Sequence, residues 1–396
     1  MSQYSKVSFS TEQLMARARV ETGLDFADHQ AVEPLTRLLK SFNEESQLHA
    51  EGAAAIEERM LRMLKNRLRM LRDFHRHPEI ADQEIKSPIM ISGTFRTGST
   101  KLQRVLAESD DFNWLHLWVG TNFASFTGKP HEDTSTRIAD ARLYADYNSR
   151  MSPELDAAHN HDLFAPDEET FVGNQSFMST AYFGFAQVPS YLQWLVQQDL
   201  TPSFRFIRDV LKYLQWQGLA DARKRWILKS PINMGVEEAV KGAFPDAYFV
   251  VTHRSPVETT ASLFSLLSSL FKCHTHSTIG DTTLLAMGQA MALESHLRFR
   301  DANPDFPILD VHYMQVATRV EETVRRVYEF AHAPLSPQSF DRMMAWDSGN
   351  PIHKHGTHKY SLADYDLTPA QIEGFCPNYI AFYKAHFADS NPGPRP

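Results

Sequence analysis

The sequence predicts an α/β protein with a parallel sheet flanked by helices, and two stretches carry that prediction. Residues 88–106 and 225–267 contain short apolar runs, typical of buried strands, followed by segments whose apolar residues recur at helical spacing. The second stretch shows strand, helix, strand and helix in that order, which is typical of a parallel sheet. The chain has 396 residues, which is enough to bury a large core.

The first 80 residues show only helical patterns. A helix capped at Ser10 or Thr11 is followed by a second over 32–42 and by a longer one over 51–77 that carries an apolar stripe. Basic residues alternate with that stripe, which favours a solvated helix face over a polyanion-binding surface. We therefore expect a helical region over 1–84 packed on the core, an α/β domain over 85–390 and a disordered tail over 391–396.

A turn rich in glycine, serine and threonine follows the apolar run 89–91. The turn covers residues 92–100, and the chain leaves it as a helix. Backbone N–H groups of such a turn and the positive end of the helix point at one spot, which favours a bound phosphate. A loop that joins strand and helix without a ligand is the alternative.

This turn resembles a nucleotide-binding loop but lacks its lysine. Gly93, Gly98 and Thr100 match the pattern G-x-x-x-x-G-K-[ST]. Ser99 stands at the lysine position, and the basic group of the turn is Arg96 instead. An ordinary NTPase needs the lysine on the β- and γ-phosphates, so that class is disfavoured.

Both strands of the second stretch end near a cation. The run 226–228 leads into Lys229, and the run 247–252 is followed by Arg254. Ligands of open parallel sheets bind at these carboxyl ends. Ser262 lies eight residues after Arg254, so both would meet one phosphate if the intervening helix turned back over it. Cations at three strand ends of an acidic protein favour a polyanionic cofactor.

Residues 159–171 concentrate histidines and carboxylates. The spacing of the histidines is not that of a metal-binding pair on a helix, and no partner ligand is identifiable. We therefore predict no metal there. Glu168 would serve as a general base if the segment folded over the site. Alternatively, the acidic residues 167–169 begin a helix behind Pro166 and stabilise its positive end.

Composition and charge argue against several classes of protein. The formal net charge of −8 argues against a general nucleic-acid binder. Cys273 and Cys376 give no disulfide framework, and the N-terminus lacks the apolar core of a signal peptide. The most apolar run, 261–271, is too short to span a bilayer. We expect a soluble, cytoplasmic protein.

Together these motifs resemble the sulfotransferase family that uses 3′-phosphoadenosine 5′-phosphosulfate (PAPS). The family's 5′-phosphosulfate loop, P-K-S-G-T-T-x, is similar to residues 95–101, with Arg96 where lysine is usual. Its 3′-phosphate motif, an arginine followed eight residues later by a serine, resembles Arg254 and Ser262. The run 350–367 resembles a late segment of bacterial-type members.

The resemblance implies a P-loop-like, three-layer α/β fold over about residues 85–385 and a set of site residues. Many relatives place a histidine where Asn233 stands, and asparagine cannot act as a base, so Glu168, then Glu169 and His116, are candidates for that role. The predicted catalytic residues are Arg96, Lys229 and Glu168. The predicted cofactor-binding residues are Arg96, Thr97, Gly98, Ser99, Thr100, Arg254, Ser262, Gly356, His358 and Lys359.

The implied activity is transfer of a sulfuryl group from PAPS to a hydroxyl or amine of a small acceptor, without a metal. Aromatic residues over 114–126 and 177–185 suggest an apolar or lipid-like acceptor. The alternatives are a nucleotide-binding protein of the same fold without transferase activity and an ATP-dependent phosphotransferase. No nucleic acid or transmembrane segment is expected, and the sequence does not indicate an oligomeric state.

Overall fold

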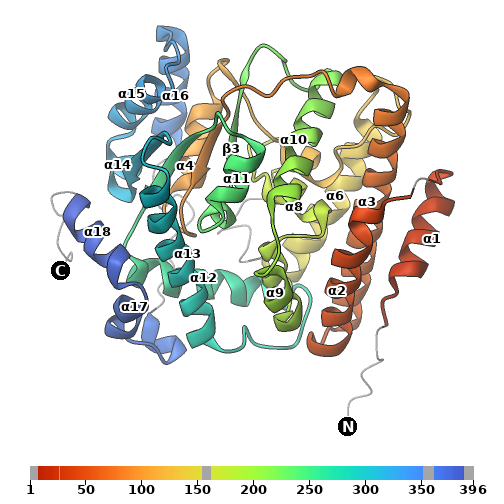
Figure 1. The fold of residues 1–396 in the computed structure, drawn as a ribbon, viewed down its shortest axis with the longest axis horizontal. Helices are drawn as coiled ribbons and strands as arrows, with labels where there is room; N and C mark the ends of the chain where they lie inside the picture. The colour runs from red at the N-terminus through yellow and green to blue at the C-terminus, as the bar shows by residue number, and fades with distance from the viewer. Residues whose placement is uncertain (1–7, 26, 154–161, 351–360, 388–396) are drawn as a thin grey trace. The chain divides into compact units, whose positions relative to one another are not determined.

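The computed structural model describes residues 8–25, 27–153, 162–350 and 361–387 (Figure 1). Contacts divide the chain into two compact units, each built from three stretches. The first unit comprises residues 1–85, 115–223 and 266–280, and the second comprises residues 86–114, 224–265 and 281–396. The boundaries expected from the sequence, at residues 84 and 390, remain a prediction.

The second unit is built on a five-stranded parallel sheet, as predicted. Its strands lie in the order β2-β3-β1-β4-β5. The central strand β1 pairs through Ile91 with Lys229 on one side and with Val250 on the other. The strands are β1 (Ile89–Ser92), β2 (Phe112–Asn113), β3 (Arg225–Lys229), β4 (Tyr248–His253) and β5 (Ile308–His312).

Helices cover both faces of this sheet. On one face, Leu102 of α4, Val324 of α15 and Met343 of α16 share a core. Helix α16 contacts both α4 and α15 (Figure 1). On the other face, Phe249 of β4 stacks on Phe299 of α13. The helices of this unit are α4 (Ser99–Ala107), α11 (Glu237–Ala243), the first part of α12 (Pro256–Lys272), α13 (Thr282–Ala302), α14 (Tyr313–Thr318), α15 (Val320–Phe330), α16 (Pro337–Gly349), α17 (Pro369–Phe375) and α18 (Pro377–Phe387).

Strand geometry decides which side chains share a face of the sheet. Ile227 of β3 and Val250 of β4 belong to the core that includes α4. Successive side chains of a strand alternate between faces, so Lys229 and Thr252, each two residues further on, point to the α4 side. His253 points to the opposite side, toward α13 and α18.

The first unit is helical among its described residues. Its N-terminal helices match the three predicted segments, except that α3 ends at Arg76, one residue before the predicted end. The helices are α1 (Thr11–Thr22), α2 (His29–Glu45), α3 (Ala50–Arg76), α5 (Leu117–Thr121), α6 (Ser135–Met151), α8 (Thr170–Gly173), α9 (Pro189–Leu195), α10 (Thr201–Trp216) and the last part of α12. Within the described residues, no helix combines the length and the apolar character needed to cross a bilayer.

The expectation of a solvated basic face on α3 is wrong for three of its arginines. Arg59, Arg67 and Arg72 are buried. Arg67 Nη2 donates to Asp28 Oδ1 at 2.8 Å, and Arg67 Nη1 donates to the carbonyl oxygen of Gln175 at 2.9 Å. A buried guanidinium requires such partners, so α3 is fixed to distant segments of its own unit.

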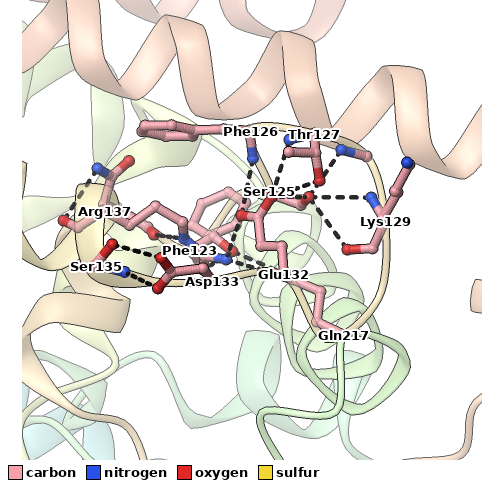
Figure 2. Close-up of polar contacts among 12 residues, drawn as sticks. Phe123, Ser125, Phe126, Thr127, Lys129, Glu132, Asp133, Ser135, Arg137 and Gln217 are labelled. Carbon is pink, nitrogen blue, oxygen red and sulfur yellow. Dashed lines mark hydrogen bonds and ion pairs between the residues drawn. The ribbon is translucent and has the colours of Figure 1, made fainter.

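The loop before α6 is also organised by a charged pair (Figure 2). Glu132 accepts hydrogen bonds from the backbone N–H groups of Phe126 and Thr127, both at 2.9 Å, and from the hydroxyl of Ser125. Arg137 donates to Glu132 Oε1 at 3.1 Å. Burial opposes ionisation here, but these hydrogen bonds hold the pKa of Glu132 below its ordinary value. The carboxylate therefore orders a loop that lacks regular structure.

Buried His274 makes the stability of the first unit depend on pH. Burial, reinforced by the charge of Arg59, lowers the pKa of His274 to about 3 from 6.5. Between these values the unfolded chain binds a proton that the folded chain does not, so stability falls as the pH falls. We expect His274→Gln to reduce the loss of unfolding free energy between about pH 7.5 and about pH 5 by about 2 kcal/mol. Denaturant titrations at both pH values test this, with exposed His29→Gln as the control. Equal losses in wild type and His274→Gln would contradict it.

Candidate functional site

The loop 93–98 joins β1 to α4 through unusual backbone angles. Gly93 and Gly98 have φ angles of 141° and 91°, and Arg96 has a φ of 66°, a region that residues other than glycine rarely adopt. Gly98 is the N-cap of α4, so the first backbone N–H groups of this nine-residue helix have no carbonyl partner within it. Together with the positive end of the helix, they favour an anion.

Two threonines hold this loop against β4. The hydroxyl oxygens of Thr97 and Thr252 lie 2.6 Å apart, and both side chains are buried. Carbonyl oxygens of Thr94 and Ser92 lie 2.8 Å and 3.1 Å from them, respectively. The side chain of Thr97 therefore has a structural role in positioning the loop.

Position 93 requires glycine for two reasons: its φ angle, and the close approach of Thr252. A Cβ atom at Gly93 would lie 2.4 Å from Thr252 Oγ1 and 2.5 Å from the Thr252 carbonyl oxygen. We expect Gly93→Ala to lower the free energy of unfolding by about 2 kcal/mol or more, because the new atom meets backbone and the φ angle is strained. Chemical denaturation measures the change. Gly288→Ala on α13, where a Cβ would meet no atom within 4 Å, is the control and should be neutral or stabilising. A loss no greater than in that control would contradict the prediction.

Three of the predicted cofactor-binding residues come together beside this loop. Arg96 Nε donates to Ser262 Oγ on α12 at 3.2 Å. Arg254 Nη1, just after β4, donates to the carbonyl oxygen of Arg96 at 3.3 Å. Ser99 and Thr100 are the first two residues of α4. The loop, the end of β4 and the start of α12 thus meet at the carboxyl edge of the sheet.

Arg254 has two further contacts that sequence reasoning did not identify. Its Nε donates to Glu258 Oε2 at 2.7 Å, one helical turn along α12. Its guanidinium carbon lies 4.3 Å from the centroid of the Tyr313 ring, within the range of a cation–π contact. Tyr313 begins α14, directly after β5, and its ring also packs against Gly98. No pattern that we identified in the sequence indicated this residue.

Lys229 ends β3 next to the central strand. It is 1% exposed, and its Cα pairs with that of Ile91, the residue one before the end of β1. Because its side chain points to the α4 side, its ammonium lies on the face of the sheet that carries the loop 93–98. Lys229 therefore places a buried basic side chain at the carboxyl end of β3, next to β1.

The sequence model of the Sulfotransferase family matches residues 88–337, which is more than half of the chain. The chain belongs to this family. It is similar to the crystal structure of sulfotransferase STF1 from Mycobacterium tuberculosis, with 28% identity, a TM-score of 0.75 and coverage of 94% of this chain and 100% of that one. It is also similar to sulfotransferase STF9 from Mycobacterium avium, with 22% identity, a TM-score of 0.82 and coverage of 96% and 98%. The second likeness supports the fold alone. The comparison with curated proteins gives no match.

The candidate bases of this sulfotransferase belong to the first unit. The backbone N–H of Glu168 donates to Asp167 Oδ1 at 2.7 Å, and Glu169 is the N-cap of α8. His116 Nδ1 lies 2.9 Å from the carbonyl oxygen of Phe164, and burial lowers the pKa of His116. The acidic residues 167–169 therefore lie directly before a short helix, whereas the alternative interpretation has them begin it; Glu169 makes no side-chain cap hydrogen bond there.

The second unit of the sulfotransferase contains Asn233, Lys229, Arg96 and Arg254. Asn233 ends the short 3-10 turn Pro231–Asn233 after β3 and is buried. Of the predicted cofactor-binding residues, Gly356, His358 and Lys359 lie outside the described residues.

Proposed function

We propose that this protein transfers a sulfuryl group from PAPS to a hydroxyl or amine of a small molecule. The acceptor atom attacks sulfur, the bond between sulfur and the bridging phosphate oxygen breaks, and 3′,5′-adenosine bisphosphate leaves. Like phosphoryl transfer, this reaction requires positioning and charge stabilisation rather than a covalent intermediate. The observation that carries the proposal is the meeting of Arg96, Arg254 and Ser262 beside the N-terminus of α4.

The donor carries two separate anionic ends, and the chain offers a matching group for each. Arg254 and Ser262 would hold the 3′-phosphate. The backbone N–H groups at 98–100 and the guanidinium of Arg96 would hold the 5′-phosphosulfate. Arginine suits this position because its planar set of donors fits phosphate oxygens.

Lys229 would stabilise the charge that develops on the bridging oxygen as the sulfur–oxygen bond breaks. Its burial places the ammonium in a medium where such charge stabilisation is stronger than in water. Glu168 stays our first candidate for the base that takes the acceptor proton, since Asn233 cannot do so.

The two aromatic segments that suggested an apolar acceptor contribute side chains to the core. The aromatic side chains of Phe123, Phe177 and Tyr182, which fall in the two segments that suggested an apolar acceptor, are fully buried core residues. An apolar or lipid-like acceptor therefore remains a prediction from the sequence. We also propose that the protein works in the cytoplasm, where its two buried cysteines stay reduced.

Ligand-dependent thermal shift separates the three functions that the sequence left open. We expect 3′,5′-adenosine bisphosphate to raise the melting temperature, and ATP with Mg²⁺ to have little effect. The reverse result would indicate a phosphotransferase. Release of the bisphosphate from PAPS in a panel of hydroxyl and amine acceptors then distinguishes a transferase from a protein that only binds the nucleotide.

A further inference from the structure

Three side chains with metal-binding atoms meet in the second unit, on the face of the sheet opposite the loop 93–98. They are His253 at the end of β4, His296 on α13 and Asp310 on β5, and one ligand atom from each lies within 4.8 Å of the others. Both histidines are fully buried. The cluster includes none of the residues to which we assign a role in sulfuryl transfer.

Both histidines use Nδ1 for a hydrogen bond to an oxygen outside the cluster. His253 Nδ1 lies 2.8 Å from the Tyr379 hydroxyl, and His296 Nδ1 lies 2.8 Å from Glu237 Oε1. Metal-binding histidines are commonly oriented in this way, with one ring nitrogen bonded to an oxygen and the other left for the metal. The two Nε2 atoms are therefore the candidate ligands.

The Nε2 atom of His296 supplies an independent observation. It is buried and has no hydrogen-bond partner within the described part of the chain. Leaving a buried polar atom without a partner costs about 1–3 kcal/mol, and such atoms in native structures often mark a site for an ion or a water molecule. A cation shared with His253 and Asp310 would satisfy this nitrogen.

Two carboxylates, those of Asp310 and Glu237, border the histidines of the cluster. His296 Nδ1 lies beside Glu237 Oε1, and Asp310 accepts hydrogen bonds from two arginines: Arg300 Nη1 donates to Asp310 Oδ1 at 2.6 Å, and Arg326 Nη2 donates to the Asp310 carbonyl oxygen at 3.2 Å. His253 Nε2 lies 2.9 Å from Asp310 Oδ1, so the second carboxylate oxygen of Asp310 takes part in neither side-chain contact.

We propose that His253, His296 and Asp310 bind a divalent transition metal, best matched by Zn²⁺, that links β4, α13 and β5. Two imidazoles and one carboxylate are ligands that zinc accepts in tetrahedral sites, with water as the fourth. Two such ligands lie about 3.3 Å apart around zinc, so His253 Nε2 and Asp310 Oδ1 need to separate by only a few tenths of an ångström. The role is structural, because the metal would fix the end of β4 directly before Arg254. This proposed zinc site differs from the expectation, made from the sequence, of a protein without a metal. The proposed chemistry of sulfuryl transfer is unchanged.

Zinc content of the purified protein tests this proposal independently of transferase activity. Tag-free full-length protein is incubated with Zn²⁺, desalted, and analysed by mass spectrometry of the elements. We expect about one zinc per chain in the wild type and less than a fifth of that in His296→Ala. The sequence contains further histidines at 353, 355 and 358, so a His353→Ala/His355→Ala variant is the control and should retain the zinc.

A second measurement covers the case in which His296→Ala fails to fold. Wild-type protein loaded with Co²⁺ should show the visible absorption of a tetrahedral site, and removal of metal by a chelator should lower its melting temperature. Three results would each overturn the proposal: no retained zinc in the wild type, equal zinc in folded His296→Ala, or loss of zinc in the His353→Ala/His355→Ala control. In those cases the cluster is a hydrogen-bonded network, or zinc binds elsewhere.

Discussion

Replacement of Lys229 by methionine is expected to lower kcat for sulfuryl transfer by about 10²–10³-fold, the usual cost of removing one preorganised group that stabilises transition-state charge. Methionine keeps most of the side-chain volume of this 1% exposed residue, so the fold should persist. Because the ammonium acts on charge that develops during bond breaking, the dissociation constant of 3′,5′-adenosine bisphosphate should change much less than kcat.

Steady-state kinetics with PAPS, combined with calorimetric titration of the bisphosphate, separate these two effects. Lys241→Met is the matched control, since Lys241 lies in the same unit on α11 and bonds to Asn303. An unchanged kcat in Lys229→Met would remove the catalytic role of this residue. Equal losses in kcat and in bisphosphate affinity would instead assign it to binding.

Replacement of Arg254 by alanine is expected to weaken binding of 3′,5′-adenosine bisphosphate by about 10–150-fold, which corresponds to the loss of a charge-assisted hydrogen bond. Binding of 5′-AMP should weaken by less than threefold, because that nucleotide lacks the 3′-phosphate. Calorimetric titration of both nucleotides measures the difference.

Two further variants sharpen this experiment. Glu258→Gln removes the carboxylate that bonds to Arg254 Nε, so it should strengthen bisphosphate binding rather than weaken it. Arg298→Ala removes an exposed guanidinium of the same unit and serves as the control. Equal losses for the bisphosphate and 5′-AMP in Arg254→Ala would refute the assignment of the 3′-phosphate site.

The strands that the sequence predicted are those with uninterrupted apolar runs. The runs at 89–91, 226–228 and 247–252 became β1, β3 and β4. β2 has only two residues, and β5 carries Asp310 and His312 on the side opposite its core residues. These polar groups find partners in His253 and Tyr383, which no local pattern could indicate.

The candidate site was predictable where spacing along the chain determines position. The eight-residue interval from Arg254 to Ser262 spans the start of α12, and both residues lie beside Arg96 in the structure. Contacts between segments that are remote in the sequence could not be predicted from spacing. Tyr313 contacts Arg254 because the strand ends that precede them, His253 and His312, are paired. Arg67 of α3 is bonded to Asp28 and Gln175 rather than to solvent.

The position of β1 at the centre of the sheet has a consequence for synthesis of the protein. Ile89 pairs with Ile227 on one side and Tyr248 on the other, and the outer strand β5 begins at Ile308. On the ribosome, β1 therefore emerges long before either neighbour and has no strand to pair with. Parallel pairing over such distances is slow and leaves apolar edges exposed, so assembly of this sheet must occur late in translation or after release.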